Sequence, residues 1–116
     1  MHELSLSSAI LETVERHAAG RRVSRVNLTV GALRQVVPDS LDFYFEIVSR
    51  DTVCDGAELR QTLIDGRARC DECAYEWELD LPLFRCPVCG ESAHPVAGEE
   101  FLVESIEVSE AEEVPA

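Results

Sequence analysis

Four of the five cysteines are spaced as ligands of a single metal ion. Cys70 and Cys73 form one CxxC pair, Cys86 and Cys89 form a second, and twelve residues separate the two pairs. Each pair can turn two thiolates toward one point, and two such turns close a tetrahedron with about 2.3 Å per Zn–S bond. All four ligands come from the protein, so the pattern predicts a structural site with no open position. Folding of residues 66–98 should therefore depend on metal.

Several alternatives for the cysteines are weaker. Zinc is favoured over iron, because a rubredoxin-like site is expected to carry glycine after the first pair, where this chain has Ala74. Neither CxxC opens a helix within a βαβ pattern, which disfavours a redox pair. An odd cysteine count and no secretory signal disfavour disulfides and predict a reducing, cytoplasmic location. Cys54 has no partner pair and is predicted to be a small buried side chain.

His2 is a second candidate metal ligand. The amino group of the chain, the amide nitrogen between residues 1 and 2, and the His2 imidazole could chelate one ion through fused rings, which suits Ni(II) or Cu(II). Glu3 adds an amide nitrogen and a carboxylate within the same reach. Taken alone, an N-terminal histidine is more often a solvated residue. His17 is expected to flank an apolar helix stripe, and His94 to lie in a loop or to serve as a recruited ligand.

Two helices and three strands must position these residues. Apolar residues four apart predict a helix over residues 4–19, with Ser5, Ser7 and Ser8 as candidate N-caps. A second helix is expected to begin at Pro38 and to bury one face. Alternating apolar residues predict strands over residues 23–33, 57–64 and 100–108. Asp65-Gly66 is a turn signal.

The element order predicts an α+β fold, in which a small three-stranded sheet carries two helices on one face, plus an inserted zinc-ribbon-like subdomain. The predicted α/β domain is discontinuous and comprises residues 1–65 and 99–110. The insertion comprises residues 66–98, and an acidic, frayed tail occupies residues 111–116. No stretch approaches the roughly 18 apolar residues of a membrane span.

The charge of the chain limits the class of partner. Its 116 residues include 10 Lys+Arg, all of them arginine, and 23 Asp+Glu, for a formal net charge of −13. This charge disfavours nucleic-acid phosphates and favours cations, basic protein surfaces or small molecules. No nucleophile–base motif is present and the predicted metal site is closed, so an enzyme is not expected. A zinc ribbon that binds protein or nucleic acid, and a small iron electron carrier, remain as alternatives.

Several motifs together resemble the HypA/HybF family of hydrogenase nickel-incorporation proteins, over nearly the whole length of the chain. These motifs are the opening Met1-His2-Glu3-Leu4-Ser5, the strand Val26-Asn27-Leu28-Thr29-Val30-Gly31, the segment Val37-Pro38-Asp39-Ser40-Leu41, and the two CxxC pairs before a final strand. Each motif alone is weak, but the combination is specific.

The resemblance implies a nickel metallochaperone rather than an enzyme. In this family the N-terminal histidine and its neighbouring glutamate belong to the nickel site, which carries over to His2 and Glu3. The paired cysteines of the family hold structural zinc, which carries over to Cys70, Cys73, Cys86 and Cys89. The resemblance also implies a GTPase partner and delivery of Ni(II) to the hydrogenase large subunit, and in some members toward urease. No membrane or nucleic-acid partner is implied, and monomer and homodimer both stay open.

Overall fold

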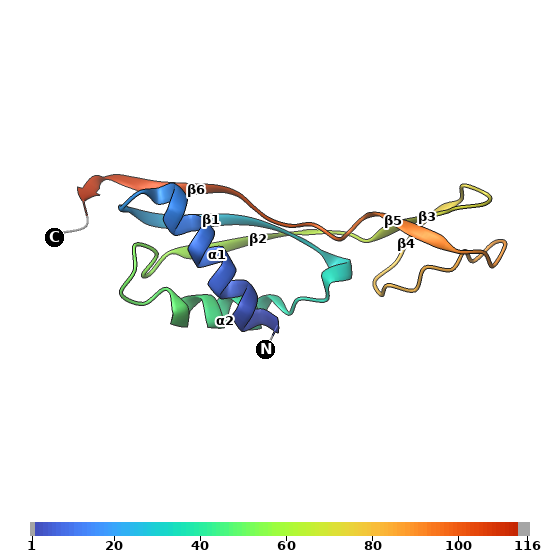
Figure 1. Ribbon diagram of the computed structural model, residues 1–116, viewed down its shortest axis with the longest axis horizontal. Coiled ribbons are helices and arrows are strands. Elements are labelled where there is room, and N and C mark those ends of the chain that lie inside the picture. The colour runs from blue at the N-terminus through green and yellow to red at the C-terminus, as the bar shows by residue number, and fades with distance from the viewer. Residues whose placement is uncertain (1, 114–116) are drawn as a thin grey trace. The chain divides into compact units, whose positions relative to one another are not determined.

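The computed structural model describes the backbone of residues 2–113 and the side chains of residues 2–109. Helices and strands follow one another along the chain as drawn in Figure 1. They are α1 (His2–Ala18), β1 (Arg21–Gly31), the 3₁₀ helix η1 (Ala32–Arg34), α2 (Pro38–Val48), β2 (Glu58–Ile64), β3 (Arg67–Cys70), β4 (Glu76–Glu78), β5 (Ala93–Ala97) and β6 (Phe101–Glu113). The strands form two three-stranded sheets, ordered β2-β1-β6 and β4-β3-β5. Within the described part of the chain, no helix is long and apolar enough to cross a membrane.

The chain divides into two compact units. Unit 1 comprises Met1–Leu28, Val36–Thr62 and Leu102–Ala116, and unit 2 comprises Thr29–Gln35 and Leu63–Phe101. The segment predicted to be inserted, residues 66–98, lies within unit 2. Unit 2 also includes the end of β1 and the 3₁₀ helix.

Unit 1 has an apolar core between its helices and one face of its sheet. The buried residues include Ile10, Val14 and Ala18 from α1, Val23, Val26 and Leu28 from β1, Leu41 and Phe45 from α2, and Leu59 from β2. The other face is polar, since the Arg25 guanidinium lies 3.0 Å from Glu58 and 3.2 Å from Glu107. The helices therefore cover a single face, as predicted, and α1 crosses the strands obliquely in Figure 1.

The start of α1 differs from the prediction. The helix begins at His2, so the three serines expected to cap it lie inside the helix instead. Ser7 is buried, and its hydroxyl donates a hydrogen bond of 3.2 Å to the carbonyl oxygen of Leu41 in α2. This bond joins the two helices and explains a polar residue on the apolar side of α1.

Other boundaries also differ. β1 ends at Gly31, two residues before the predicted end at Leu33, because the chain turns into the 3₁₀ helix there. β6 runs to Glu113, so the predicted end at residue 108 is wrong. Of the predicted tail, residues 111–113 lie in β6, and residues 114–116 lie outside the described residues. Leu63, expected to share the buried side of β2 with Leu59, is 59% exposed.

Unit 2 contains the smaller sheet, in which β3 pairs antiparallel with both β4 and β5. Residues 65 and 66 form no turn, contrary to the prediction. Gly66 is instead buried at a close approach, where a Cβ would collide with the Leu33 side chain and the Leu79 carbonyl oxygen. Among residues 67–97 only Ala68, Cys70 and Cys86 are buried. The ribbon, which we define as residues 67–97, therefore has almost no apolar core beyond its own cysteines.

Candidate metal centre

The structure brings the four paired cysteines of unit 2 together. Their sulfur atoms all lie within 4.8 Å of one another. Sγ of Cys70 lies 3.5 Å from Sγ of Cys89, and Sγ of Cys73 lies 3.7 Å from Sγ of Cys86. A tetrahedron with Zn–S bonds of about 2.3 Å has edges of about 3.8 Å, so the spacing fits a four-sulfur metal site. Among the described residues, no other group of three or more His, Cys, Asp or Glu side chains is placed to hold a metal ion.

The two halves of the site repeat the same local geometry. In the first half, the backbone N–H groups of Glu72 and Cys73 point at Sγ of Cys70, at 3.3 and 3.4 Å. In the second half, the N–H groups of Val88 and Cys89 point at Sγ of Cys86, at 3.4 and 3.5 Å. Such donors stabilise a thiolate and hold it in position.

Each tight turn ends in a residue with left-handed backbone. Gly90, which follows the second pair, has φ +80°, a conformation that glycine adopts without strain. The equivalent residue after the first pair is Ala74, with φ +64°. Residue type does not reveal this requirement, because alanine normally avoids that region. The two turns thus have the same backbone conformation, and Ala74 adopts it with strain.

This strain predicts that Ala74→Gly stabilises the ribbon by about 1 kcal/mol, because glycine adopts the left-handed region without a Cβ clash. Gly90→Ala should destabilise it by a similar amount. Denaturant unfolding of the metal-loaded variants measures both effects. Ala93→Gly, in β5 without a positive φ, serves as the control and should destabilise. A destabilising Ala74→Gly would contradict this account.

The thiols of Cys86 and Cys89 differ in how readily they ionise. Burial opposes ionisation of Cys86, but N–H groups of Cys89 and Val88 outweigh it and lower its pKa to about 7. For Cys89, the N–H of Glu91 lowers the pKa, but neighbouring sulfurs, Cys70 first, raise it to about 12. The thiol of Cys86 therefore ionises readily and that of Cys89 does not. A dication supplies the charge that four adjacent thiolates need, so metal loading should release protons.

His94 lies on a strand rather than in a loop. It is an exposed residue of β5, and its Nδ1 lies 2.6 Å from a carboxylate oxygen of Asp71, inside the first CxxC turn. Its imidazole is thus engaged by a carboxylate and does not join the sulfur cluster. The alternative of His94 as a recruited ligand finds no support in this geometry.

The other candidate ligands lie in the first turn of α1, in unit 1. His2 is exposed, and Met1 lies outside the described residues. A carboxylate oxygen of Glu3 accepts a hydrogen bond of 3.2 Å from the N–H of Val37, the residue that precedes α2. The Val37 N–H lowers the pKa of Glu3, which stays ionised. His2 and Glu3 are therefore adjacent and accessible, but the Glu3 carboxylate already has a partner.

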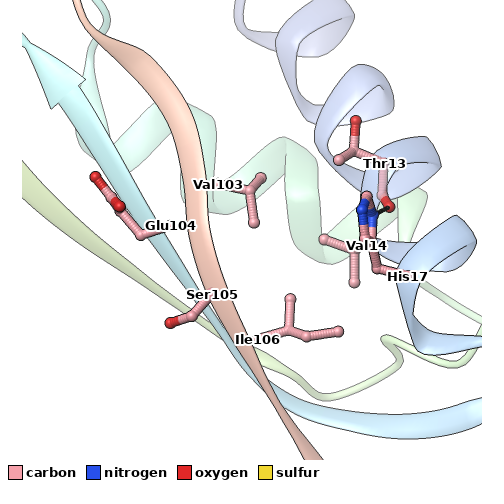
Figure 2. Close-up of a pocket in the computed structure, with 7 residues that line it drawn as sticks. All are labelled: Thr13, Val14, His17, Val103, Glu104, Ser105 and Ile106. Carbon is pink, nitrogen blue, oxygen red and sulfur yellow. Dashed lines mark hydrogen bonds between the residues drawn. The ribbon is translucent and has the colours of Figure 1, made fainter.

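Two remaining candidates have ordinary roles. Burial raises the pKa of Cys54 to about 11, with a contribution from Glu15, so this thiol is the buried neutral residue that was predicted. His17 is exposed beside a cavity of about 200 Å³ between α1 and β6. Figure 2 shows Val103 and Ile106 of β6 pointing toward α1 across this cavity. Nδ1 of His17 lies 2.9 Å from the carbonyl oxygen of Thr13, within its own helix.

Comparison with known proteins agrees with the sequence resemblance. The family model described as hydrogenase/urease nickel incorporation, metallochaperone, hypA matches residues 1–108. The hydrogenase maturation factor HypA of Geobacter metallireducens is 40% identical over 109 residues, covering 93% of this chain and 99% of that protein. The factor of the same name from Streptomyces avermitilis is 42% identical over 112 residues, covering 91% and 86%.

Solved structures show the same fold. The solution structure of the nickel metallochaperone HypA from Helicobacter pylori superposes with a TM-score of 0.67 at 20% identity, covering 91% of this chain and 96% of that one. A second solution structure, of a HypA protein, gives a TM-score of 0.68 at 22% identity and covers 94% and 97%. The predicted α+β class is therefore confirmed.

Proposed function

The chain belongs to the HypA family of hydrogenase and urease nickel-incorporation metallochaperones, and from this membership we propose a division of labour between its units. The start of unit 1 carries Ni(II) as cargo, and the four cysteines of unit 2 hold a structural Zn²⁺. With a GTPase partner, the protein passes nickel to the hydrogenase large subunit during [NiFe]-hydrogenase maturation, or toward urease. The cysteines form no disulfides, which suits the reducing cytoplasm.

The accessibility of the first turn of α1 supports the nickel site. The first N–H groups of a helix have no acceptor within it, so deprotonating the amides of His2 and Glu3 breaks no helical hydrogen bond. We assign as ligands the amino nitrogen of the chain, these two amide nitrogens and the exposed His2 imidazole. A set of nitrogens suits planar Ni(II). Two amide anions also offset the positive end of the helix dipole, which otherwise disfavours a cation.

Glu3 has an outer role in this proposal. Its carboxylate is hydrogen-bonded to the Val37 N–H, so it contributes a backbone nitrogen to nickel rather than a carboxylate oxygen. The same hydrogen bond fixes the first turn of α1 against the start of α2. The residue thereby positions His2 while leaving its imidazole free to reach a partner.

Zinc suits the cysteine site better than nickel cargo does. Four sulfur ligands leave no open position through which an ion is passed on. The sulfur spacing fits the Zn–S tetrahedron, and the ribbon has little other core. A closed site of this kind contributes folding energy.

The ribbon also has the surface of an interaction module. Leu81, Leu83 and Val88 are 54%, 70% and 67% exposed in unit 2. A partner protein that covered these side chains would bury apolar surface, which favours association. The net charge of −13 opposes nucleic acid as the partner, so we assign this surface to a protein.

The exposed His2 at the helix start, in a member of this family, is the observation that carries the nickel assignment. A nickel titration of the zinc-loaded protein tests it, followed by absorption and native mass spectrometry. We expect one nickel per chain in addition to one zinc, with affinity that falls at lower pH, because protons compete for every proposed ligand. Displacement of zinc by nickel, or binding without pH dependence, would contradict the assignment.

A further inference from the structure

An acidic cavity lies between α2 and β2 in unit 1, and none of its lining residues is a proposed metal ligand. Its volume is about 450 Å³, a size at which proteins hold small ligands or inserted side chains. Asp42, Glu46 and Glu58 line it, and no lysine or arginine does. We call it the α2–β2 cavity.

The charges around the cavity are unbalanced. Asp42 and Glu46 are exposed and stand four residues apart on α2, where like charges destabilise a helix. Neither side chain has an ion pair or a hydrogen bond among the residues that the structure describes. Glu58, on β2, is already shared between Arg25 and Arg60, at 3.0 and 3.6 Å. The free negative charge is thus concentrated on α2.

A buried hydroxyl in the lining also lacks a partner. Ser49 is 1% exposed, and its Oγ forms no hydrogen bond within the described part of the chain. Buried polar atoms are nearly always hydrogen-bonded, so this sealed oxygen would gain its missing partner if the side chain turned toward a donor in the cavity. Cys54, 0% exposed, also lines the cavity, but burial raises its pKa to about 11 and keeps it a neutral thiol.

We propose that the α2–β2 cavity binds the guanidinium group of an arginine side chain presented by a partner protein. The group would sit between the carboxylates of Asp42 and Glu46, and a turn of the Ser49 side chain would let its Oγ accept a hydrogen bond from the guanidinium. A guanidinium has five N–H donors in a plane and is weakly hydrated, so it can satisfy several separated acceptors at once. This site goes beyond nickel carriage and does not depend on it.

The geometry favours a side chain over a metal ion. The cavity has no cluster of three ligand atoms within 4.8 Å, whereas the cysteine site does. Its volume far exceeds that of a bare ion, and the one soft ligand in its lining is protonated. A small cation would therefore find no preformed coordination, while a planar, extended cation would.

The test uses the full-length, zinc-loaded, ¹⁵N-labelled protein and N-acetyl-L-arginine amide as the probe, at low salt. We expect saturable amide shifts centred on Ser49 and residues 54–59, with Kd of order millimolar. N-acetyl-L-glutamine amide, which is neutral, should cause no saturable shifts there. Asp42→Asn combined with Glu46→Gln should weaken arginine binding at least ten-fold without lowering Tm, because it removes a repulsive pair.

A charge-matched control separates local contact from long-range attraction. Asp39→Asn with Glu12→Gln removes the same charge outside the cavity and should leave binding within two-fold. Ser49→Ala should weaken binding several-fold while leaving Tm unchanged or higher, since its hydroxyl has no partner to lose. Equal weakening by both double variants, shifts elsewhere, or the same shifts with Mg²⁺ alone would overturn the proposal. Nickel binding at His2 should be unaffected in every variant, so failure here leaves the nickel assignment intact.

Discussion

Removal of metal from the four-cysteine site is expected to unfold the ribbon and leave unit 1 folded. Structural zinc in small domains contributes about 10–16 kcal/mol of apparent binding energy at neutral pH. The ribbon has little else to replace it, since Ala68 and two of the cysteines are its only buried residues. Without the dication, nothing attracts the four sulfurs to one point, although two pairs of them lie only 3.5 and 3.7 Å apart. Unit 1 keeps its apolar core, which contains no proposed metal ligand.

Hydrogen exchange read by mass spectrometry tests this result, before and after zinc is removed with a chelator. Amides of residues 67–97 should lose protection, and those of α1 and α2 should keep it. Cys86→Ser should reproduce the effect without chelator and abolish stoichiometric zinc. Cys54→Ala is the matched control, because it removes a buried cysteine of unit 1 and should leave zinc content unchanged. Full protection of the ribbon after zinc removal would contradict a structural role for the metal.

The metal centre could be predicted because its information is local. Two residues between cysteines fix each turn, and the N–H groups that point at Cys70 and Cys86 belong to the next three residues. Such geometry follows from spacing alone. The strained backbone of Ala74 could not be predicted, because residue type argues against it.

Features that depend on contacts between distant segments were missed. The serines near the start of α1 have the composition of N-caps, but Ser7 bonds to Leu41, thirty-four residues away. Gly66 has the local pattern of a turn, but its small size is required by Leu33 and Leu79. The α2–β2 cavity likewise arises where two elements meet, and no periodicity of either one reveals it. Periodicity predicted the helices and the apolar face of each element, because both follow from the residue pattern within that element.

Replacement of His2 by alanine is expected to abolish tight nickel binding and leave zinc unchanged. Loss of an outer contact to a metal ligand typically costs 10–100-fold in affinity, so loss of a direct ligand should cost more than about 100-fold. The fold should survive, because His2 is exposed and is not one of the buried core residues. Nickel titration of zinc-loaded wild-type and variant protein, with metal content measured separately, gives both quantities.

Two further variants make this result specific to the proposed ligands. His17→Ala removes an exposed histidine from the other end of the same helix and should bind nickel like the wild type. A Gly-Ser extension before Met1 keeps His2 but moves the amino group, and it should weaken nickel binding about as much as His2→Ala. Retention of tight binding in the extended chain would remove the amino nitrogen from the ligand set. Retention in His2→Ala would overturn the whole N-terminal site, because the imidazole is its only side-chain ligand.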